Sequence, residues 1–357
     1  MIKIKFLKAH NGDSILINCN DEKGIPKNIL IDGGTRQTYI NSALNQSGDL
    51  KKEIDSIKKR SEFIDLLILT HIDNDHICGL LHWFEKDKDA YKLIKNVWFN
   101  SGKLIAEYFR EPENLALRLE LKSPKTPKTG VHQAVEFEDY LMDKKIWNRQ
   151  LILQGDNVED DNIQIQVLSP NKDQLCKLLK EFRKEFKDSA YTSGKAKDWD
   201  TNLINFIEEE KLNSFKFTED KAPNNGSSIT FILTLQNKKF LFLADGHPTQ
   251  IYEALKELGY SKENPLEVEL LKVSHHGSKK NTSKQLLELI KTNNYIISTN
   301  SLGDGHPNKR TVARIIANNP NAILHFNYEN VKNGVINKQD FSDFEYFKIK
   351  LTTEINY

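Results

Sequence analysis

Apolar and polar residues alternate along the first third of the chain in patterns typical of short strands and a helix. Residues 2–19 favour two strands separated by the turn HNGDS, and residues 28–34, NILIDGG, favour a buried strand that ends in an acidic residue and two glycines. The apolar run FIDLLIL precedes a polar loop and the stretch ICGLLHWF, which is typical of a buried helix. The pattern therefore predicts a strand, a polar loop and a helix in direct succession.

A second region rich in strands begins at Asn224. SSITFILTL and KFLFLA predict a hairpin, IYEALKELGY predicts a helix, and VELLKVS predicts a strand that leads into a histidine-rich loop. Residues 103–150 are helical and polar, and we interpret them as an insertion. Residues 172–222 are dense in charged residues, and we interpret them as a second insertion, partly helical and at the surface. Strands that alternate with helices predict a layered α/β (α+β) fold, which we expect to form one domain over residues 1–357.

The polar loop of the first region, THIDNDHICGL, concentrates side chains that bind metal ions. Its potential ligands are His71, Asp73, Asp75 and His76. Carboxylate oxygens combined with imidazole nitrogens suit Zn²⁺ or Mn²⁺ better than Ca²⁺, which prefers oxygen alone. The alternative is a solvated turn, because Asp and Asn favour turns in any case. The apolar strand before the loop and its two histidines favour the metal site.

Other polar residues also follow predicted strands. They are Asp32 after ILI, Asp245 after FLFLA, His275 and His276 after LLKVS, and His306 after the strand in YIISTN. Ligands from the ends of several strands converge on one edge of a sheet, where α/β folds usually form a site.

The motifs LIDGG, THIDNDHICGL, LADGHP, SHHGS and GDGHP occur in this order, and together they resemble those of the metallo-β-lactamase-fold hydrolases. The resemblance is nearest to the branch that includes the hydrolase domain of the competence protein ComEC and the teichoic-acid phosphorylcholine esterases. It covers about the first hundred residues and roughly residues 222–311. It implies an αββα sandwich with one or two metal ions, Zn²⁺ or Mn²⁺, at its edge.

The resemblance also implies roles for single residues. His71 and Asp73 would hold one metal ion, Asp75 and His76 the second, and Asp245 would bridge both. One of His275 and His276 would complete the second site, and this choice stays open. Asp32 would orient a ligand. The other member of the pair, or His306, would hold the substrate or protonate the leaving group, so that the expected catalytic set is Asp75, His275, His276 and His306.

The chain departs from the family pattern at two places. Asp73 stands where the wider superfamily has histidine, which makes the site more negative and favours phosphoester cleavage over β-lactamase or glyoxalase chemistry. The histidine that the family usually has between the loop at His71–His76 and Asp245 is missing. Only His82 and His132 lie in that interval, and we expect His82 to be a packed helix residue and His132 to be exposed. Asn225 is a candidate substitute, and His247 is either a ligand or a turn residue. We expect Asp13 to form a turn rather than to bind metal.

Charge and cysteine content narrow the function classes. The 51 Lys and Arg residues nearly balance the 50 Asp and Glu residues, so no overall attraction to nucleic acid or to a membrane follows. Three scattered cysteines and no signal-peptide pattern favour a cytoplasmic protein. We therefore expect a metal-dependent hydrolase of phosphodiester bonds, either a nuclease or a phosphodiesterase. Its substrate would be a phosphodiester, and nucleic acid is one candidate. The alternatives are a carboxyl-ester, lactone or thioester hydrolase, or a metal-stabilised binding subunit without catalysis, and the sequence identifies no protein partner.

Overall fold

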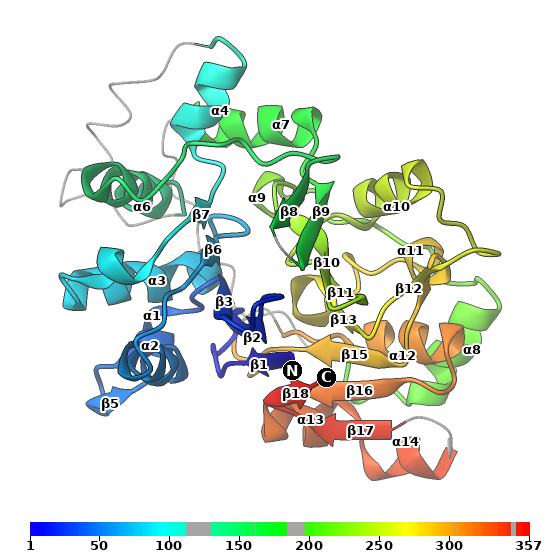
Figure 1. Cartoon of the computed structure of the whole chain (residues 1–357). Coiled ribbons are helices and arrows are strands. Elements are labelled where there is room, and N and C mark those ends of the chain that lie inside the picture. Colours follow the sequence, from blue (N-terminus) through cyan, green and yellow to red (C-terminus); the bar gives the residue numbers. More distant parts are fainter. Residues whose placement is uncertain (112–129, 161, 184–196, 304, 344–347) are drawn as a thin grey trace. The chain divides into compact units, whose positions relative to one another are not determined.

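The computed structural model describes residues 1–111, 130–160, 162–183, 197–303, 305–343 and 348–357, and it divides the chain into two compact units. Unit 1 consists of Met1–Leu153, Pro170–Tyr191 and Glu354–Tyr357, and unit 2 consists of Gln154–Ser169 and Thr192–Thr353. Each unit contains one large sheet with helices packed on it (Figure 1). The predicted α/β fold class is confirmed.

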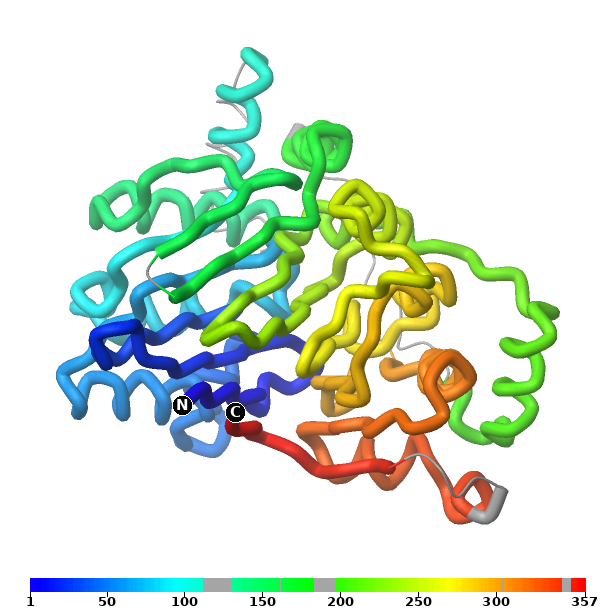
Figure 2. Tube along the Cα trace, turned by 45° about the vertical axis from the view of Figure 1, so that its right-hand side comes forward, coloured from blue at the N-terminus to red at the C-terminus, as the bar shows by residue number. Residues whose placement is uncertain are grey.

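Unit 1 has a sheet in the order β18-β1-β2-β3-β6-β7. Its strands are β1 (Lys3–Phe6), β2 (Ile15–Asn20), β3 (Pro26–Ile31), β6 (Leu66–Ile68), β7 (Val97–Trp98) and β18 (Glu354–Asn356). Neighbours from β18 to β3 are antiparallel, and β3, β6 and β7 are parallel. Figure 2 shows the two labelled chain ends close together, because β18 pairs with β1. A short pair, β4 (Ile40–Asn41) with β5 (Gln46–Ser47), lies outside this sheet.

The central strands β2, β3 and β6 are buried on both faces where they carry consecutive apolar side chains. Leu16, Leu30 and Leu67 belong to the cluster that the helices cover, whereas Ile15 and Ile29 point to the opposite face and are also buried. Apolar side chains are therefore buried on both faces of this part of the sheet.

The helices of unit 1 bury one apolar stripe each. They are α1 (Arg36–Tyr39), α2 (Asp49–Lys59), α3 (Asn74–Lys86), α4 (Gly102–Tyr108), α6 (Gly130–Lys144), α7 (Lys172–Arg183) and the 3₁₀ turn η1 (Ala90–Leu93). Leu50, Ile54 and Ile57 of α2 follow the helical period and are at most 1% exposed. Among the described residues, no helix is both long and apolar enough to cross a bilayer.

The interpretation of residues 103–150 and 172–222 as surface insertions is wrong for several of their described segments. Helix α6 packs on α3 and buries Phe137 and Leu141 completely, and α7 buries Leu175. His132 on α6 is 5% exposed, not solvent-facing as we expected. These helices are amphipathic, so a polar average composition hid one buried stripe. Residues 112–129 and 184–196 of the two predicted insertions lie outside the described residues.

Unit 2 has a sheet in the order β17-β16-β15-β13-β11-β10-β9-β8. Its strands are β8 (Asn157–Asp160), β9 (Ile163–Ser169), β10 (Thr230–Leu235), β11 (Lys238–Phe242), β13 (Leu270–Lys272), β15 (Asn294–Ile297), β16 (Ile323–Phe326) and β17 (Lys348–Leu351). Neighbours from β8 to β11 are antiparallel, and those from β11 to β17 are parallel. The short strands β12 (Leu266–Glu267) and β14 (Ile290–Lys291) pair separately. The carboxyl ends of β11, β13 and β15 therefore share one edge, which brings the loops after them together.

Helices cover one face of this sheet around Leu241, Leu271, Tyr295 and Leu324. They are α8 (Leu203–Lys211), α9 (Pro223–Gly226), α10 (Pro248–Glu257), α11 (Lys284–Glu288), α12 (Lys309–Asn318), α13 (Glu329–Val335), α14 (Lys338–Asp343) and the 3₁₀ turn η2 (Ser274–Gly277).

A buried ion pair joins α8 to α12. Both nitrogens of the Arg314 fork donate to Glu210, at 2.9 and 2.8 Å, and Arg314 is 2% exposed. Leu203 at the start of α8 is fully buried, so this part of the predicted second insertion also belongs to the core.

Candidate metal-binding residues

In unit 1, the polar loop after β6 turns directly into α3. Asp73 precedes the first helical residue, and Asp75 and His76 lie in the first turn of the helix. His71 and His76 are buried and their ring centroids lie 4.0 Å apart, with the rings tilted by 52°, whereas the Asp73 side chain is 34% exposed. The loop thus has the buried strand-to-helix setting that the sequence predicted.

Asp32, directly after β3, fixes the orientation of both histidines. Its Oδ2 lies 2.8 Å from His76 Nδ1 and accepts the Thr70 hydroxyl at 2.7 Å, while its Oδ1 accepts the Thr70 backbone N–H at 2.8 Å. Because the Thr70 hydroxyl donates to Asp32, its oxygen is left to accept from His71 Nδ1, 3.0 Å away. Both rings therefore carry their proton on Nδ1 and offer the Nε2 lone pair to a ligand.

Burial has the largest effect on the pKa of Asp32. Desolvation raises the pKa of this carboxyl above its usual value, and the contacts with His76 and Thr70 offset only part of the rise. A buried carboxylate beside two imidazoles is the arrangement that holds histidines as metal ligands in proteins.

A tight turn before β2 also packs against the metal loop. The Asp13 backbone N–H donates to the Asp75 carbonyl at 3.2 Å, and Asn11 Nδ2 donates to Asp75 Oδ2 at 3.1 Å. A side chain at Gly12 would have its Cβ only 1.7 Å from the Asp75 carbonyl oxygen, so the close approach requires glycine. Asp13 is 2% exposed, and one of its carboxylate oxygens lies within 4.8 Å of a His76 ring nitrogen.

We expected Asp13 only to form a turn, but its buried carboxylate is also a candidate metal ligand beside His76. The GDS turn of the resemblance was the available signal, but only the packing of this turn on α3 brings its carboxylate to His76.

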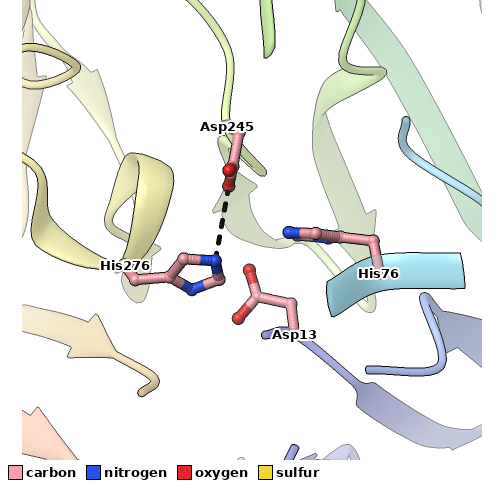
Figure 3. A group of neighbouring side chains, drawn as sticks. All are labelled: Asp13, His76, Asp245 and His276. Atoms are coloured by element: carbon pink, nitrogen blue, oxygen red, sulfur yellow. Dashed lines mark ion pairs between the residues drawn. The ribbon is translucent and has the colours of Figure 1, made fainter. Parts of the chain in front are cut away.

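In unit 2, the loops after β11 and β13 carry the second group of donors. His275 and His276 have φ angles of +47° and +52°, an unusual backbone for two consecutive residues with side chains. His276 Nδ1 donates to the Ser298 carbonyl at 2.9 Å, and its Nε2 lies 3.9 Å from Asp245 Oδ1. Figure 3 marks this ion pair and labels Asp13 and His76 of unit 1 as well.

His275 lies in a different environment from His276. Its Nε2 is 3.5 Å from Asp245 Oδ2, its Nδ1 is 3.0 Å from Asn281 Oδ1, and its side chain is 19% exposed against 3% for His276. Burial alone would lower the pKa of His275, but Asp245 and Asp220 outweigh it and raise this pKa above its ordinary value.

Asp220 is a residue that sequence reasoning missed. Its Oδ2 accepts Asn225 Nδ2 at 2.6 Å and Asn281 Nδ2 at 3.1 Å, and lies 3.6 Å from His275 Nδ1. Burial alone would raise the pKa of Asp220, yet the contact with His275 and the hydrogen bonds from Asn225 and Asn281 hold it well below the usual range. Asp220 sits in a segment that we interpreted as an insertion, and no motif marked it.

The remaining predicted residues have separate positions in unit 2. His247 directly precedes α10, with Nε2 4.0 Å from Asp220 Oδ2, and a Cβ at Gly226 would meet its ring at 2.8 Å. The His306 ring contacts the His275 ring at 4.8 Å between centroids. In unit 1, His82 is a packed helix residue, as predicted, and its Nδ1 donates to the Arg36 carbonyl at 2.9 Å. Asp304 of the GDGHP motif lies outside the described residues.

The donor chemistry of both units fits a divalent transition metal. Each unit pairs a buried carboxylate with a buried histidine whose Nδ1 is engaged elsewhere: Asp13 with His76, and Asp245 with His276. Mixed oxygen and nitrogen donors suit Zn²⁺ and Mn²⁺. Asp and His residues thus form groups that could hold a metal ion, while the individual ligand roles and the bridging role of Asp245 stay predictions.

Comparison with known proteins supports the fold family for part of the chain. Residues 9–156 match the family model of the metallo-beta-lactamase superfamily, which includes the Asp13, Asp32 and His71–His76 positions. No curated protein sequence matches the chain.

Similar solved structures share little sequence with this chain. They include the metallo-beta-lactamase fold protein YhfI from Bacillus subtilis, at 10% identity and a TM-score of 0.41 over 100% of both chains. Zinc-bound PqqB from Methylobacterium extorquens also has 10% identity and a TM-score of 0.41, over 99% of this chain and 100% of PqqB. A long form RNase Z from yeast has 13% identity and a TM-score of 0.37, over 99% of this chain and 41% of RNase Z. At these TM-scores the similarities carry no conclusion about this chain.

Proposed function

We propose that this chain is a metal-dependent hydrolase that cleaves phosphodiester bonds, of the ComEC and phosphorylcholine-esterase branch. The observation that carries the proposal is the network of Asp32, which fixes His76 directly and His71 through Thr70. Burying two imidazoles costs free energy unless their nitrogens have partners. Histidines fixed in this way are typical of metal ligands, because the carboxylate sets the tautomer and the direction of Nε2.

The donors of unit 2 extend the proposal. We assign His276 as the metal ligand of the HHGS motif, because it is more buried than His275 and its Nδ1 is anchored on Ser298. His275 keeps more solvent access and would contact the substrate.

A phosphodiester is favoured over a neutral ester by the charge of the donors. Asp73 Oδ2 lies 3.8 Å from His71 Nε2, the Asp13 carboxylate lies near His76, and Asp75 belongs to the same loop. Asp73 stands where the wider superfamily has a further histidine, so these donors are more negative. A bound Zn²⁺ or Mn²⁺ would supply an activated water and would neutralise the charge that develops on the phosphoryl oxygens. The chain's residues hold that ion, orient the substrate through His275, and keep the histidine tautomers fixed.

The test is hydrolysis of bis-p-nitrophenyl phosphate by the purified protein with Mn²⁺ or Zn²⁺ added. We expect activity in the wild type and none above background in His76→Ala or Asp245→Ala, with metal content measured on the same samples. His325→Gln, which changes a buried histidine on β16, is the matched control and should retain activity.

Parallel assays with single-stranded DNA, RNA, p-nitrophenyl acetate and a lactone separate the rivals. Activity on the acetate or lactone but on no phosphodiester would favour the carboxyl-ester alternative. A folded protein loaded with metal but inert on all these substrates would favour the binding subunit.

A further inference from the structure

Asp220 occupies the centre of a polar cluster, and the predicted functions assign Asp220 itself no role. The cluster consists of Asp220, Asn225, Asn281 and His275, all in unit 2. Asp220 also accepts the Ala222 backbone N–H at 3.0 Å, so its position is fixed by its own loop as well. A carboxylate that accepts from this many donors is held in one place.

Hydrogen bonds orient both asparagines, and Asn225 Nδ2, which also lies 3.4 Å from His275 Nδ1, has its nearer partner in Asp220 at 2.6 Å. Each gives its Nδ2 to Asp220 Oδ2, and Asn281 Nδ2 also lies 3.1 Å from the Asp245 carbonyl. The Oδ1 of Asn281 is therefore turned toward His275 Nδ1 at 3.0 Å, and it accepts a proton from that nitrogen. As a result His275 Nε2 is the atom presented to Asp245, at 3.5 Å.

We propose that Asp220 is a positioning residue for His275. Through Asn281 and by its own charge, 3.6 Å from Nδ1, Asp220 selects the ring tautomer that directs Nε2 toward Asp245. The inference rests on the proposed function, in which His275 contacts the substrate. It assigns a role to the segment before α9, which no motif marks.

The first test compares Asp220→Asn with the wild type on bis-p-nitrophenyl phosphate. We expect kcat to fall about 10–100-fold, the range for losing a residue that orients a ligand, with metal content unchanged. Asp220→Glu should recover part of the loss, because it restores the charge. Glu263→Gln removes an exposed carboxylate of the same unit and should have no effect.

A double-mutant cycle separates positioning from general support of the fold. If Asp220 acts through His275, Asp220→Asn should cause no further loss of kcat in a His275→Ala background. Additive losses would overturn the proposal, as would a parallel loss of metal content or of thermal stability that accounts for the lower rate.

A spectroscopic measurement distinguishes failure of this proposal from failure of the proposed function. At a pH high enough to keep the His275 ring neutral, long-range ¹H–¹⁵N NMR should show its proton on Nδ1 in the wild type and a mixture of tautomers in Asp220→Asn. An unchanged tautomer in the variant would refute the positioning role even if the protein is an active hydrolase. The expected change in a protein that cleaves no phosphodiester would instead leave the positioning intact and refute the hydrolase.

Discussion

At the scale of single residues, one buried carboxylate organises the donors of unit 1. Asp32 is 1% exposed and contacts His76 and Thr70 with both of its oxygens. Neither histidine could keep a fixed tautomer if this acceptor were lost, because the Thr70 hydroxyl would also be free to rotate. The metal affinity of unit 1 should therefore depend on a residue that binds no metal itself.

Asp32→Asn should weaken the binding of Zn²⁺ or Mn²⁺ by about 10–100-fold, since an amide cannot accept from all three donors. The measurement is metal binding by titration calorimetry on the metal-free protein. Asp21→Asn is the control, because Asp21 is also buried in unit 1 but caps a hairpin turn through Lys23 and Ile25. Equal weakening in both variants would show that the loss reflects folding.

A second residue, His325, makes the stability of unit 2 depend on pH, and it lies outside the group of metal-binding candidates. His325 on β16 accepts from Thr352 Oγ1 at Nδ1 and donates to Asn294 Oδ1 at Nε2, so it is held neutral. Burial, with the charge of Lys350, lowers the pKa of His325 from 6.5 to about 4.

The sign of the effect follows from the unfolded chain, in which His325 binds a proton more readily than in the folded protein. Neutral His325 makes its full contribution to the free energy of unfolding above pH 6.5, and this contribution is lost as the pH falls toward 4. We expect a loss on the order of 1–2 kcal/mol, after allowance for solvent screening. Urea unfolding at pH 7.5 and 4.5 measures it, and His325→Gln should flatten this part of the slope. An identical slope in the variant would contradict the assignment.

At the scale of elements, α6 shows how a polar segment can still be part of the core. Phe137 stacks on Phe84 of α3 at 5.6 Å between ring centroids and meets Phe99 edge-on at 5.1 Å. The helix begins at Gly130, where a Cβ would lie 2.7 Å from the Ile72 carbonyl of the metal loop. Packing of α6 therefore supports both α3 and the loop before it.

Phe137→Ala should destabilise unit 1 by about 3–5 kcal/mol, the cost of a large cavity in a close-packed core. The free energy of unfolding in urea measures this loss. Met142→Ala on the same helix is the control, because Met142 is 43% exposed. A loss below about 1 kcal/mol for Phe137→Ala would mean that α6 is a surface cover, as its composition first indicated.

At the scale of the whole molecule, the sheet of unit 1 is completed by a distant part of the sequence. Strand β18 pairs antiparallel with β1, and Ile2 and Tyr357 exchange both backbone hydrogen bonds, at 2.9 and 2.8 Å. In an antiparallel ladder such pairs alternate, so Ile355, opposite Ile4, also bonds to β1, whereas the N–H of Asn356 points away from β1.

Proline at these two positions should therefore have different effects. Ile355→Pro removes an N–H that the ladder uses and should lower the stability of unit 1 by about 1–3 kcal/mol. Asn356→Pro on the same edge strand should cost clearly less, because its N–H faces outward. Hydrogen exchange of the β1 amides reports the pairing directly. Equal protection of β1 in both variants would contradict this register.

The sequence predicted the elements whose pattern is local. The strand, loop and helix around His71–His76, the β10–β11 hairpin and the helix α10 all have the expected order, because apolar periodicity and turn residues specify them. It did not predict the contact of Asp13 with α3, the place of Asp220 or the pairing of β18. Each of these depends on segments far apart in the chain, and no local pattern encodes such a contact.

The order of synthesis gives the β18–β1 pairing a further consequence. Because β18 follows all of unit 2 along the chain, β1 leaves the ribosome long before its partner strand exists. Throughout that interval β1 presents a bare row of backbone donors and acceptors to other nascent chains. Lys3 and Lys5, whose charges lie on that strand, would then discourage premature association until the last strand arrives.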